Sequence, residues 1–133
     1  MDCIFCEIIK GNIPSSKVYE DDDILAILDI SQTTMGHTLV MPKKHYANFL
    51  EMPNGEYQIL MGKVQEIAKR IVDNLKATGV NILINTGETA GQTVKHIHVH
   101  IIPRYDENDS ISIQFKENKF DLNEVLSKIN ANH

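Results

Sequence analysis

The sequence lacks an excess of positive charge. Its 133 residues include 13 Lys and Arg against 18 Asp and Glu, which gives a formal net charge of −5. Nucleic acids and anionic membrane surfaces attract strongly positive proteins, so this balance argues against both as partners. Any anionic ligand must therefore be held by local groups.

The sequence also lacks long hydrophobic runs, and none approaches the roughly 18 residues of a transmembrane helix. The segment Met1–Glu7 carries acidic residues where a signal peptide carries basic ones. Internal repeats and low-complexity segments are absent as well. We therefore expect a soluble cytoplasmic protein, with residues 1–133 forming a single globular domain that leaves no room for a second one.

Cysteine is scarce, with only Cys3 and Cys6 in the chain, spaced as C-x-x-C. In the cytoplasm such a pair more often binds a metal or acts in redox chemistry than forms a structural disulfide. No thioredoxin-like β-α-β pattern follows the pair, which disfavours the redox role. Two free buried cysteines are the simplest alternative.

The pattern of apolar residues predicts an α+β fold, an antiparallel sheet of about five strands with one long helix and a C-terminal helix. Strands are expected at 17–20, 24–28, 38–41, 80–85 and 96–102, helices at 57–75 and 121–130, and a short helix or turn at 4–10. Asn54 is a possible N-cap and Gly79 a C-terminal stop for the long helix, while Asp121 caps the last one. We expect the core at about 3–110 and a C-terminal extension at 111–133.

Three histidines stand at alternate positions in an apolar run, namely His96, His98 and His100. In an extended chain alternate side chains share a face, so the apolar neighbours point into a core while the histidines form a row on the other side. Such a row can bind zinc, with His37 or Asp29 as a further ligand. It can also attack phosphorus through one imidazole while the others hold phosphate oxygens.

The loop before the histidines favours the phosphate chemistry. It contains two glycines, which let backbone amides approach an anion, and neutral hydrogen-bond donors from Asn85, Gln92 and Thr93. By itself the loop would be equally typical of a plain solvated connection. Beside a row of histidines it indicates a phosphate-binding site.

The segment Gly91–Arg104 resembles the signature of the histidine triad family, in which His-x-His-x-His is followed by two apolar residues. Segments Ile4–Ile9, Leu28–Ile30 and His37–His45 are similar to family segments in the same order. The resemblance covers the chain up to about Ile111. It implies a homodimer in which the long helix and a sheet edge pair across a two-fold axis, so that the sheet continues from one subunit into the other.

The resemblance also implies an enzyme, a nucleotide hydrolase or transferase that acts at the α-phosphate of purine nucleotides. Its substrates would be nucleoside phosphoramidates or dinucleoside polyphosphates, and no catalytic cofactor would take part. His98 would attack the phosphorus and form a covalent nucleotidyl-histidine. His100 and His37 would stabilise the phosphate charge and assist the leaving group.

Other positions that match the family would contact the substrate. Asp29 matches the acid that accepts the ribose hydroxyls, and Ile30 would flank the purine. Phosphate oxygens would be held by Asn85, Gln92 and Thr93. Judged without the family, Asp29 would be a turn residue.

The cysteine pair matches only part of the family. Cys3, Cys6, His45 and His96 resemble the structural zinc site of several bacterial and archaeal triad proteins and of the related galactose-phosphate uridylyltransferases. Two thiolates and two imidazoles suit a closed tetrahedral zinc site. The alternative to an enzyme is a zinc-stabilised nucleotide-binding regulatory module in which turnover is incidental.

Overall fold

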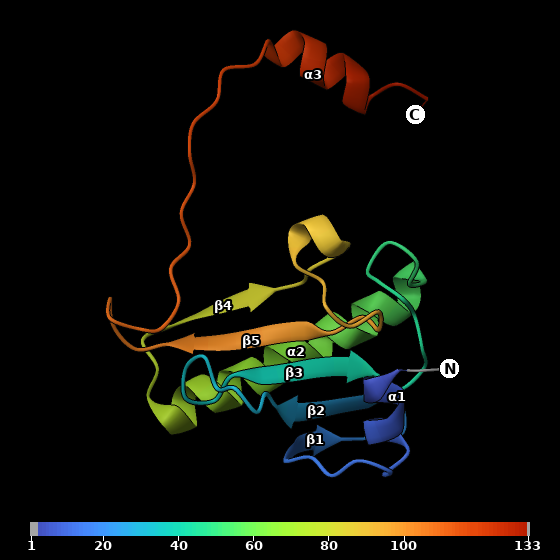
Figure 1. Ribbon diagram of the computed structural model, residues 1–133, viewed down its shortest axis with the longest axis vertical. Helices are drawn as coiled ribbons and strands as arrows, with labels where there is room; N and C mark the ends of the chain where they lie inside the picture. Colours follow the sequence, from blue (N-terminus) through green and yellow to red (C-terminus); the bar gives the residue numbers. More distant parts are fainter. Residues whose placement is uncertain (1–2, 133) are drawn as a thin grey trace.

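Five strands form the centre of the protein. The structure is a computed structural model that describes residues 3–132, so Met1, Asp2 and His133 lie outside the described residues. The strand order is β1-β2-β3-β5-β4, with every neighbouring pair antiparallel, and β4 forms one edge (Figure 1). The strands are β1 (Lys17–Glu20), β2 (Ile24–Leu28), β3 (Thr38–Pro42), β4 (Gly79–Leu83) and β5 (Val99–Arg104). The expected α+β class with an antiparallel five-stranded sheet is confirmed.

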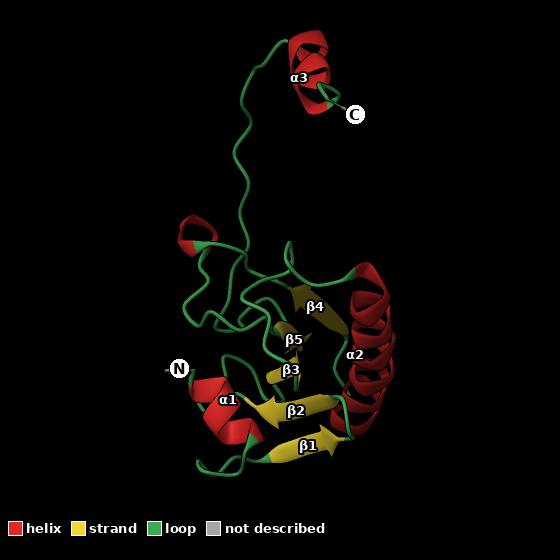
Figure 2. Cartoon of the chain, turned by 90° about the vertical axis from the view of Figure 1, so that its right-hand side faces the viewer, coloured by secondary structure: helices red, strands yellow, loops and turns green. Residues whose placement is uncertain are grey.

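Helices lie on both faces of this sheet. The helix α1 (Ile4–Ile9) lies against one face and α2 (Asn54–Leu75) covers the other (Figure 2). A short 3₁₀ helix, η1 (Glu88–Ala90), and the helix α3 (Leu122–Ile129) lie outside these layers. Among residues 3–132, no helix combines the length and the apolar character needed to cross a membrane.

The strand β2 shows how one segment serves two cores. Because alternate residues of a strand point to opposite faces, Ile24 and Ala26 pack beneath α2, whereas Leu25 and Ile27 pack against Phe5 of α1. A strand covered on both faces needs apolar residues at every position, which explains the unbroken apolar sequence of β2.

The alternation predicted for the histidine segment is confirmed. Ile97, Val99 and Ile101 are buried in the core beneath α2, so the three histidines face the side of α1. The strand begins later than expected, at Val99 rather than at His96. The reason is that the N–H of Ile97 leaves the sheet and donates to the carbonyl of Tyr46 at 2.8 Å. This bond ties the segment before β5 to the loop after β3.

The long helix is confirmed, but both expected ends are wrong. Asn54 is the first helical residue; Pro53 occupies the N-cap position, and the side chain of Asn54 accepts a hydrogen bond from Gln58 instead. At the other end Lys76 adopts the left-handed conformation with φ 59° and ends the helix. Since the chain already reverses at Lys76, Gly79 is not a helix stop and becomes the first residue of β4.

The C-terminal helix lies close to its predicted bounds. α3 begins after Asp121, whose carboxylate accepts hydrogen bonds from the backbone N–H groups of Asn123 at 3.0 Å and Glu124 at 3.4 Å. Residues 112–120 run in an extended course away from the sheet, so α3 lies far from both cores (Figure 1).

Candidate active site and metal site

Four potential metal ligands from three segments meet beside α1. They are Cys3 and Cys6 at the start of α1, His45 after β3 and His96 before β5, and their ligand atoms all lie within 4.8 Å of one another. The Sγ of Cys6 lies 3.3 Å from Nδ1 of His45, and the Nδ1 atoms of His45 and His96 lie 3.1 Å apart. A zinc ion with Zn–N and Zn–S bonds of about 2.0–2.3 Å holds tetrahedral ligand atoms roughly 3.3–3.8 Å apart. The residues present therefore fit a zinc ion.

A backbone carbonyl orients one of these ligands. Nε2 of His96 donates to the carbonyl of Pro42 at 2.8 Å, so Nδ1 keeps its lone pair and faces the thiols. Burial lowers the pKa of His96, which keeps the ring neutral, as a metal ligand must be. Burial and the neighbouring Cys3 raise the pKa of the Cys6 thiol to about 11, so a bound cation would have to displace its proton.

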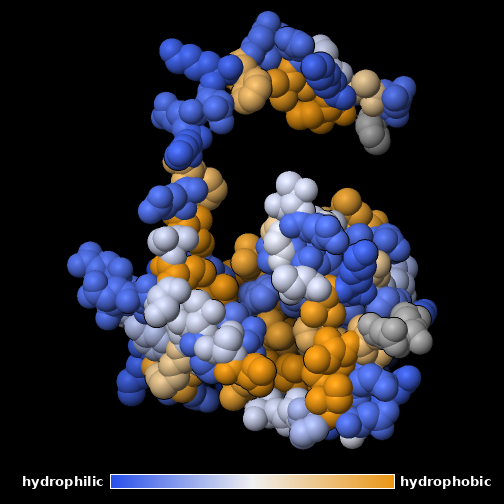
Figure 3. Space-filling model, in the orientation of Figure 1, coloured by the Kyte–Doolittle hydropathy of each residue, from blue (hydrophilic) through white to orange (hydrophobic). Residues whose placement is uncertain are grey.

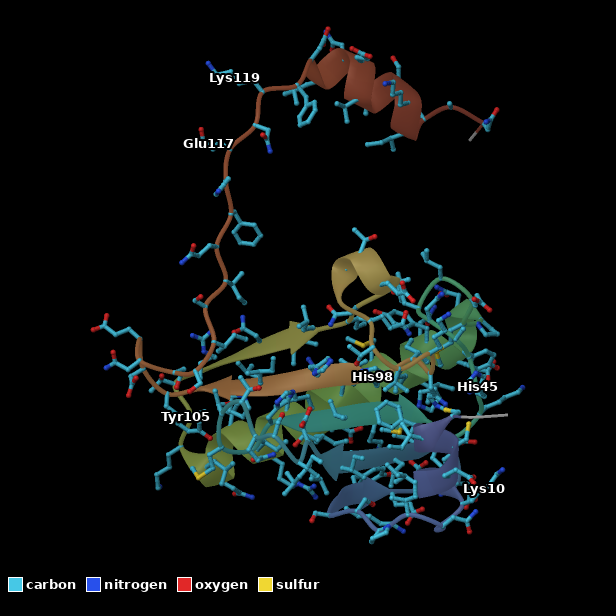
Figure 4. All side chains as sticks on the ribbon, viewed as in Figure 1. Lys10, His45, His98, Tyr105, Glu117 and Lys119 are labelled. Carbon is cyan, nitrogen blue, oxygen red and sulfur yellow. The ribbon has the colours of Figure 1, made fainter. Side chains whose placement is uncertain are left out.

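The middle histidine has a defined tautomer. Nδ1 of His98 lies 2.8 Å from the carbonyl of His96, and because a carbonyl only accepts, Nδ1 carries the proton. Nε2 therefore keeps a free lone pair, and burial lowers the pKa of the ring so that it stays neutral. Phe5 contacts this imidazole edge-on, with ring centroids 4.9 Å apart. Figure 4 shows His98 and His45 at the same end of the sheet.

A second group of polar side chains lies next to His98, whose ring centroid is 5.1 Å from that of His100. Nε2 of His37 lies 3.0 Å from Nδ1 of His100 and 3.8 Å from a carboxylate oxygen of Asp29. The carboxylate favours a proton on Nε2 of His37, and the buried Nδ1 of His37 has no partner among the described residues. An unpartnered acceptor costs less than an unpartnered N–H. His37 thus donates to His100, which leaves Nε2 of His100 as a protonated donor.

The charges of this group are unequal. Burial raises the pKa of Asp29, but hydrogen bonds from Ser31 and the nearby His37 and His100 outweigh it and leave the pKa below its ordinary value. Burial, together with the neighbouring His98 and His37, lowers the pKa of His100 to about 4, while Asp29 opposes this shift. The site therefore holds neutral imidazoles beside one carboxylate, an arrangement that suits nucleophilic attack and proton donation near neutral pH.

Asp29, His37 and His100 could also bind a catalytic metal, an alternative that the sequence left open. The ligand atoms of Asp29, His37 and His100 also lie within 4.8 Å of one another. Their shortest contact, at 3.0 Å, is already explained by the hydrogen bond between the two imidazoles. The two metal hypotheses differ in which residues metal binding requires, and this difference can be tested.

The loop 85–93 is shaped by a buried glutamine. The amide nitrogen of Gln92 donates to the carbonyls of Ala47 at 2.6 Å and Val94 at 3.0 Å, and its oxygen accepts from the N–H of Gly87 at 2.9 Å. Both polar atoms of the Gln92 side chain thus bond to the backbone. Gly87 has a φ of 87°, which explains a glycine at that position.

The remaining expected substrate contacts lie around this centre. Ile30 is fully exposed directly after Asp29, while Thr93 is exposed and Asn85 half-buried in the loop. One oxygen of Asp29 is held by the backbone N–H and the hydroxyl of Ser31, at 2.8 and 2.7 Å. The roles assigned to these side chains, and to Gln92, stay predictions.

Sequence reasoning missed three contributors to this geometry. Phe5 was noted only as part of a family segment, and neither the carbonyl of Pro42 nor the double hydrogen bond from Ser31 was expected. Ser31 follows Asp29 by two residues, a spacing that is typical of an Asx turn, so this contact could have been found from the sequence. The other two contacts join distant segments and leave no local signal.

Comparison with solved structures supports the fold over the whole chain. The crystal structure of a member of the HIT family of proteins from Bacillus subtilis superposes with a TM-score of 0.93 at 45% identity, covering 100% of this chain and 98% of that one. A Zn-bound histidine triad family protein from Mycobacterium smegmatis superposes with a TM-score of 0.78 at 40% identity, covering 89% of this chain and 85% of that one.

Comparison with known sequences identifies the family. Adenylylsulfatase HINT3 from Arabidopsis thaliana is 42% identical over 107 residues, which are 80% of this chain and 54% of the relative. The family model described as HIT domain matches residues 10–107, from the end of α1 to the segment after β5. These residues include six of the eight that form the two centres on the side of α1, namely Asp29, His37, His45, His96, His98 and His100. The chain therefore belongs to the HIT domain family.

Proposed function

We propose that the protein is a nucleotide hydrolase or transferase that acts at the α-phosphate of purine nucleotides, with nucleoside phosphoramidates or dinucleoside polyphosphates as substrates. The observation that carries the proposal is the tautomer of His98, whose Nδ1 donates to a backbone carbonyl and whose Nε2 lone pair is free. A relative named as an adenylylsulfatase supports chemistry at an adenylyl phosphorus.

The reaction proceeds in two displacements. Nε2 of His98 forms a bond to the α-phosphorus, and the bond from phosphorus to the leaving group breaks, with the electron pair and a proton going to the leaving group. A water oxygen then attacks the same phosphorus, the P–N bond breaks and its electron pair returns to Nε2. One proton of the water replaces the proton that the leaving group took, the other goes to solvent, and the nucleoside monophosphate is released.

His100 and His37 act together in both displacements. Because Nδ1 of His100 accepts from His37, its Nε2 presents an N–H to a phosphate oxygen or to the leaving group. The carboxylate of Asp29, 3.8 Å from His37, favours this protonation pattern. These groups stabilise the charge that develops on the phosphate.

Contacts with the rest of the substrate follow from the family match. Asp29 accepts the ribose hydroxyls and Ile30 flanks the purine. Asn85 and Thr93 hold phosphate oxygens, and Gln92, whose side-chain amide already donates to two backbone carbonyls, contributes by fixing the shape of the loop.

A structural zinc ion completes the proposal, held by Cys3, Cys6, His45 and His96. A Zn-bound relative supports zinc as the ion. When bound, zinc would join α1 to the segment after β3 and to the segment before β5. No step of the reaction passes through it. The two cysteines form no disulfide, which fits a reducing compartment, so we place the protein in the cytoplasm. We further propose a homodimer, with the catalytic core of each copy at about residues 3–110.

Trapping the covalent intermediate tests the proposal. A reaction with an adenylyl substrate labelled at the α-phosphate, quenched in acid, should leave label on His98, located by peptide mapping. The His98→Ala variant should lose the label and lower kcat/KM by roughly 10³-fold or more. Lys95→Ala, a change at an exposed neighbouring position, serves as the control. Normal labelling and turnover in His98→Ala would exclude His98 as the nucleophile.

A further inference from the structure

The loop that joins β2 to β3, residues 29–37, carries two groups of the proposed active site. Asp29 is its first residue and His37 its last, and a carboxylate oxygen of Asp29 lies 3.8 Å from Nε2 of His37. At the base of the loop the N–H of Asp29 donates to the carbonyl of His37 at 2.9 Å. The shape of this loop therefore sets how the carboxylate faces His37 and, through His37, His100.

Gln32 holds this loop together from the inside. Its amide nitrogen donates to the carbonyl of Asp29 at 2.7 Å and to the carbonyl of His37 at 2.8 Å. Its amide oxygen accepts from the N–H of Gly36 at 2.8 Å. One side chain thus joins the first residue of the loop to its last two.

The backbone of Gln32 lies in the left-handed region, with a φ of 40°. Glycine adopts this conformation readily, and among the other residues Asn and Asp do so most often. A glutamine there is strained, and such strain persists only where the surrounding structure determines it. Because the backbone alone would favour glycine, the position requires the side chain of Gln32.

The large apolar side chains of the loop contribute little to its shape. Ile30 is fully exposed and Met35 is 59% exposed. Figure 3 shows such uncovered apolar surface, in orange, on the face of the core that carries α1. Since neither side chain is buried in the core, the loop depends on its hydrogen bonds for a fixed shape.

Two hydroxyl groups fasten the outer part of the loop to the end of β5. The hydroxyl of Thr34 donates to the carbonyl of Pro103 at 2.6 Å. The hydroxyl of Tyr105, directly after β5, donates to the carbonyl of Met35 at 2.6 Å. Neither bond joins the two ends of the loop to each other, whereas the bonds of Gln32 do.

The carboxylate of Asp29 is not free to rotate toward His37. One of its oxygens is held by the N–H and the hydroxyl of Ser31, at 2.8 and 2.7 Å, and the other is the one that faces Nε2 of His37. A shorter distance therefore requires the backbone of Asp29 to move relative to that of His37. The amide of Gln32, bonded to both carbonyls, opposes that movement.

We propose that Gln32 is a positioning residue for the reaction, one that keeps the carboxylate of Asp29 from closing on His37. The proposal rests on the hydrolase function proposed above, because it concerns the proton donor which that function assigns to His100. Gln32 acts through the backbone groups of Asp29, Gly36 and His37, to which its amide is bonded.

The separation of 3.8 Å between Asp29 and His37 leaves the N–H of His37 to His100. A carboxylate is a stronger hydrogen-bond acceptor than a neutral imidazole. At hydrogen-bond distance Asp29 would therefore take the N–H that His37 donates to Nδ1 of His100, 3.0 Å away. No other described hydrogen bond of the His100 ring keeps its proton on Nε2, where a phosphate oxygen or the leaving group needs it. Gln32 thus preserves this donor by holding the ends of the loop in place.

The tautomer of His100, measured by ¹⁵N NMR of the imidazole rings without substrate, tests the role of Gln32. The wild type should carry the proton on Nε2, whereas Gln32→Met, which keeps the length of the side chain but not the amide, should show both tautomers. Gln32→Gly should give the same change, although glycine relieves the left-handed backbone. Tyr105→Phe, which removes one hydrogen bond from the outer part of the same loop, is the matched control and should keep the wild-type spectrum. An unchanged tautomer in both Gln32 variants, or the same change in Tyr105→Phe, overturns the proposal.

Steady-state kinetics with an adenylyl phosphoramidate supply a second measurement, with far-UV circular dichroism as a check of folding. Both Gln32 variants should lower kcat by roughly tenfold, because the proton donor is disrupted, and should change KM by less than about threefold. Tyr105→Phe should keep the wild-type kcat even where its Tm falls. An equal fall of kcat in all three variants would show that loop stability alone is responsible. Because the NMR spectra need no turnover, a wild type that fails to hydrolyse the substrate counts against the proposed function and leaves the test of Gln32 in place.

Discussion

Phe5 packs edge-on against the imidazole of His98, with the ring centroids 4.9 Å apart and the ring planes at 78°. Phe5 lies between the two cysteines in α1, so the segment that contributes half of the metal ligands also supports the proposed nucleophile. The contact, together with the hydrogen bond from Nδ1 of His98 to the carbonyl of His96, leaves the imidazole little freedom to turn.

Phe5→Leu should lower kcat more than it changes KM. Leucine keeps much of the apolar volume of Phe5 but removes the ring that contacts His98, so the nucleophile is less well aimed while the substrate contacts remain. We expect a loss of roughly tenfold in kcat, measured by steady-state kinetics with an adenylyl phosphoramidate. Zinc content serves as a control for α1, and an unchanged kcat would show that the ring does not position His98.

Metal should be lost together with the cysteines. Cys3→Ala/Cys6→Ala removes both thiolates of the proposed zinc site, and since metal binding contributes folding free energy, the Tm should fall with the metal content. Chelation of the wild type should reproduce the lower Tm. Metal content by elemental analysis and Tm by calorimetry are the measurements. Metal retained without the cysteines, with chelation abolishing turnover, would favour a catalytic metal at Asp29, His37 and His100 instead.

Acid should destabilise the protein in a defined range through His100. Its pKa is lowered to about 4 by burial and by His98 and His37, with Asp29 opposing, while an imidazole of the unfolded chain titrates near ~6.5. Between these values the unfolded chain binds more protons, so the stability is complete above pH ~6.5 and falls as the pH drops toward 4. The Tm of the wild type and of His100→Asn, measured over this range, should diverge, with the variant losing less; parallel curves would contradict the assignment.

Gln92→Ala should act mainly by destabilising the loop 85–93 rather than by removing a substrate contact. The change removes three hydrogen bonds to backbone groups and leaves at least one partly buried group unpaired, at a cost of about 1–3 kcal/mol. Amide hydrogen exchange in the loop should become faster and the Tm lower. Thr93→Ala is the matched control, because Thr93 is exposed and should raise KM without lowering the Tm. Equal Tm values for the two variants would argue against a bracing role for Gln92.

Local pattern was enough to predict most of the secondary structure. The unbroken apolar run of β2, the helical spacing in α2 and the Asp121 cap of α3 depend on residues close in sequence, so their physical consequences can be read from the sequence. The predicted ends of α2 are wrong because Pro53 and Lys76 adopt backbone conformations that a search for preferred capping residues does not detect.

The sequence by itself determined that three histidines would share one face and that two cysteines were spaced to bind together, because strand and helix periodicity are local properties. Only the tertiary structure brought His45 and His96 to the cysteines, set the tautomer of His98 through the carbonyl of His96, and paired the side-chain amide of Gln92 with backbone groups. These features depend on contacts between distant segments, whose geometry is decided when the two faces of the sheet are packed.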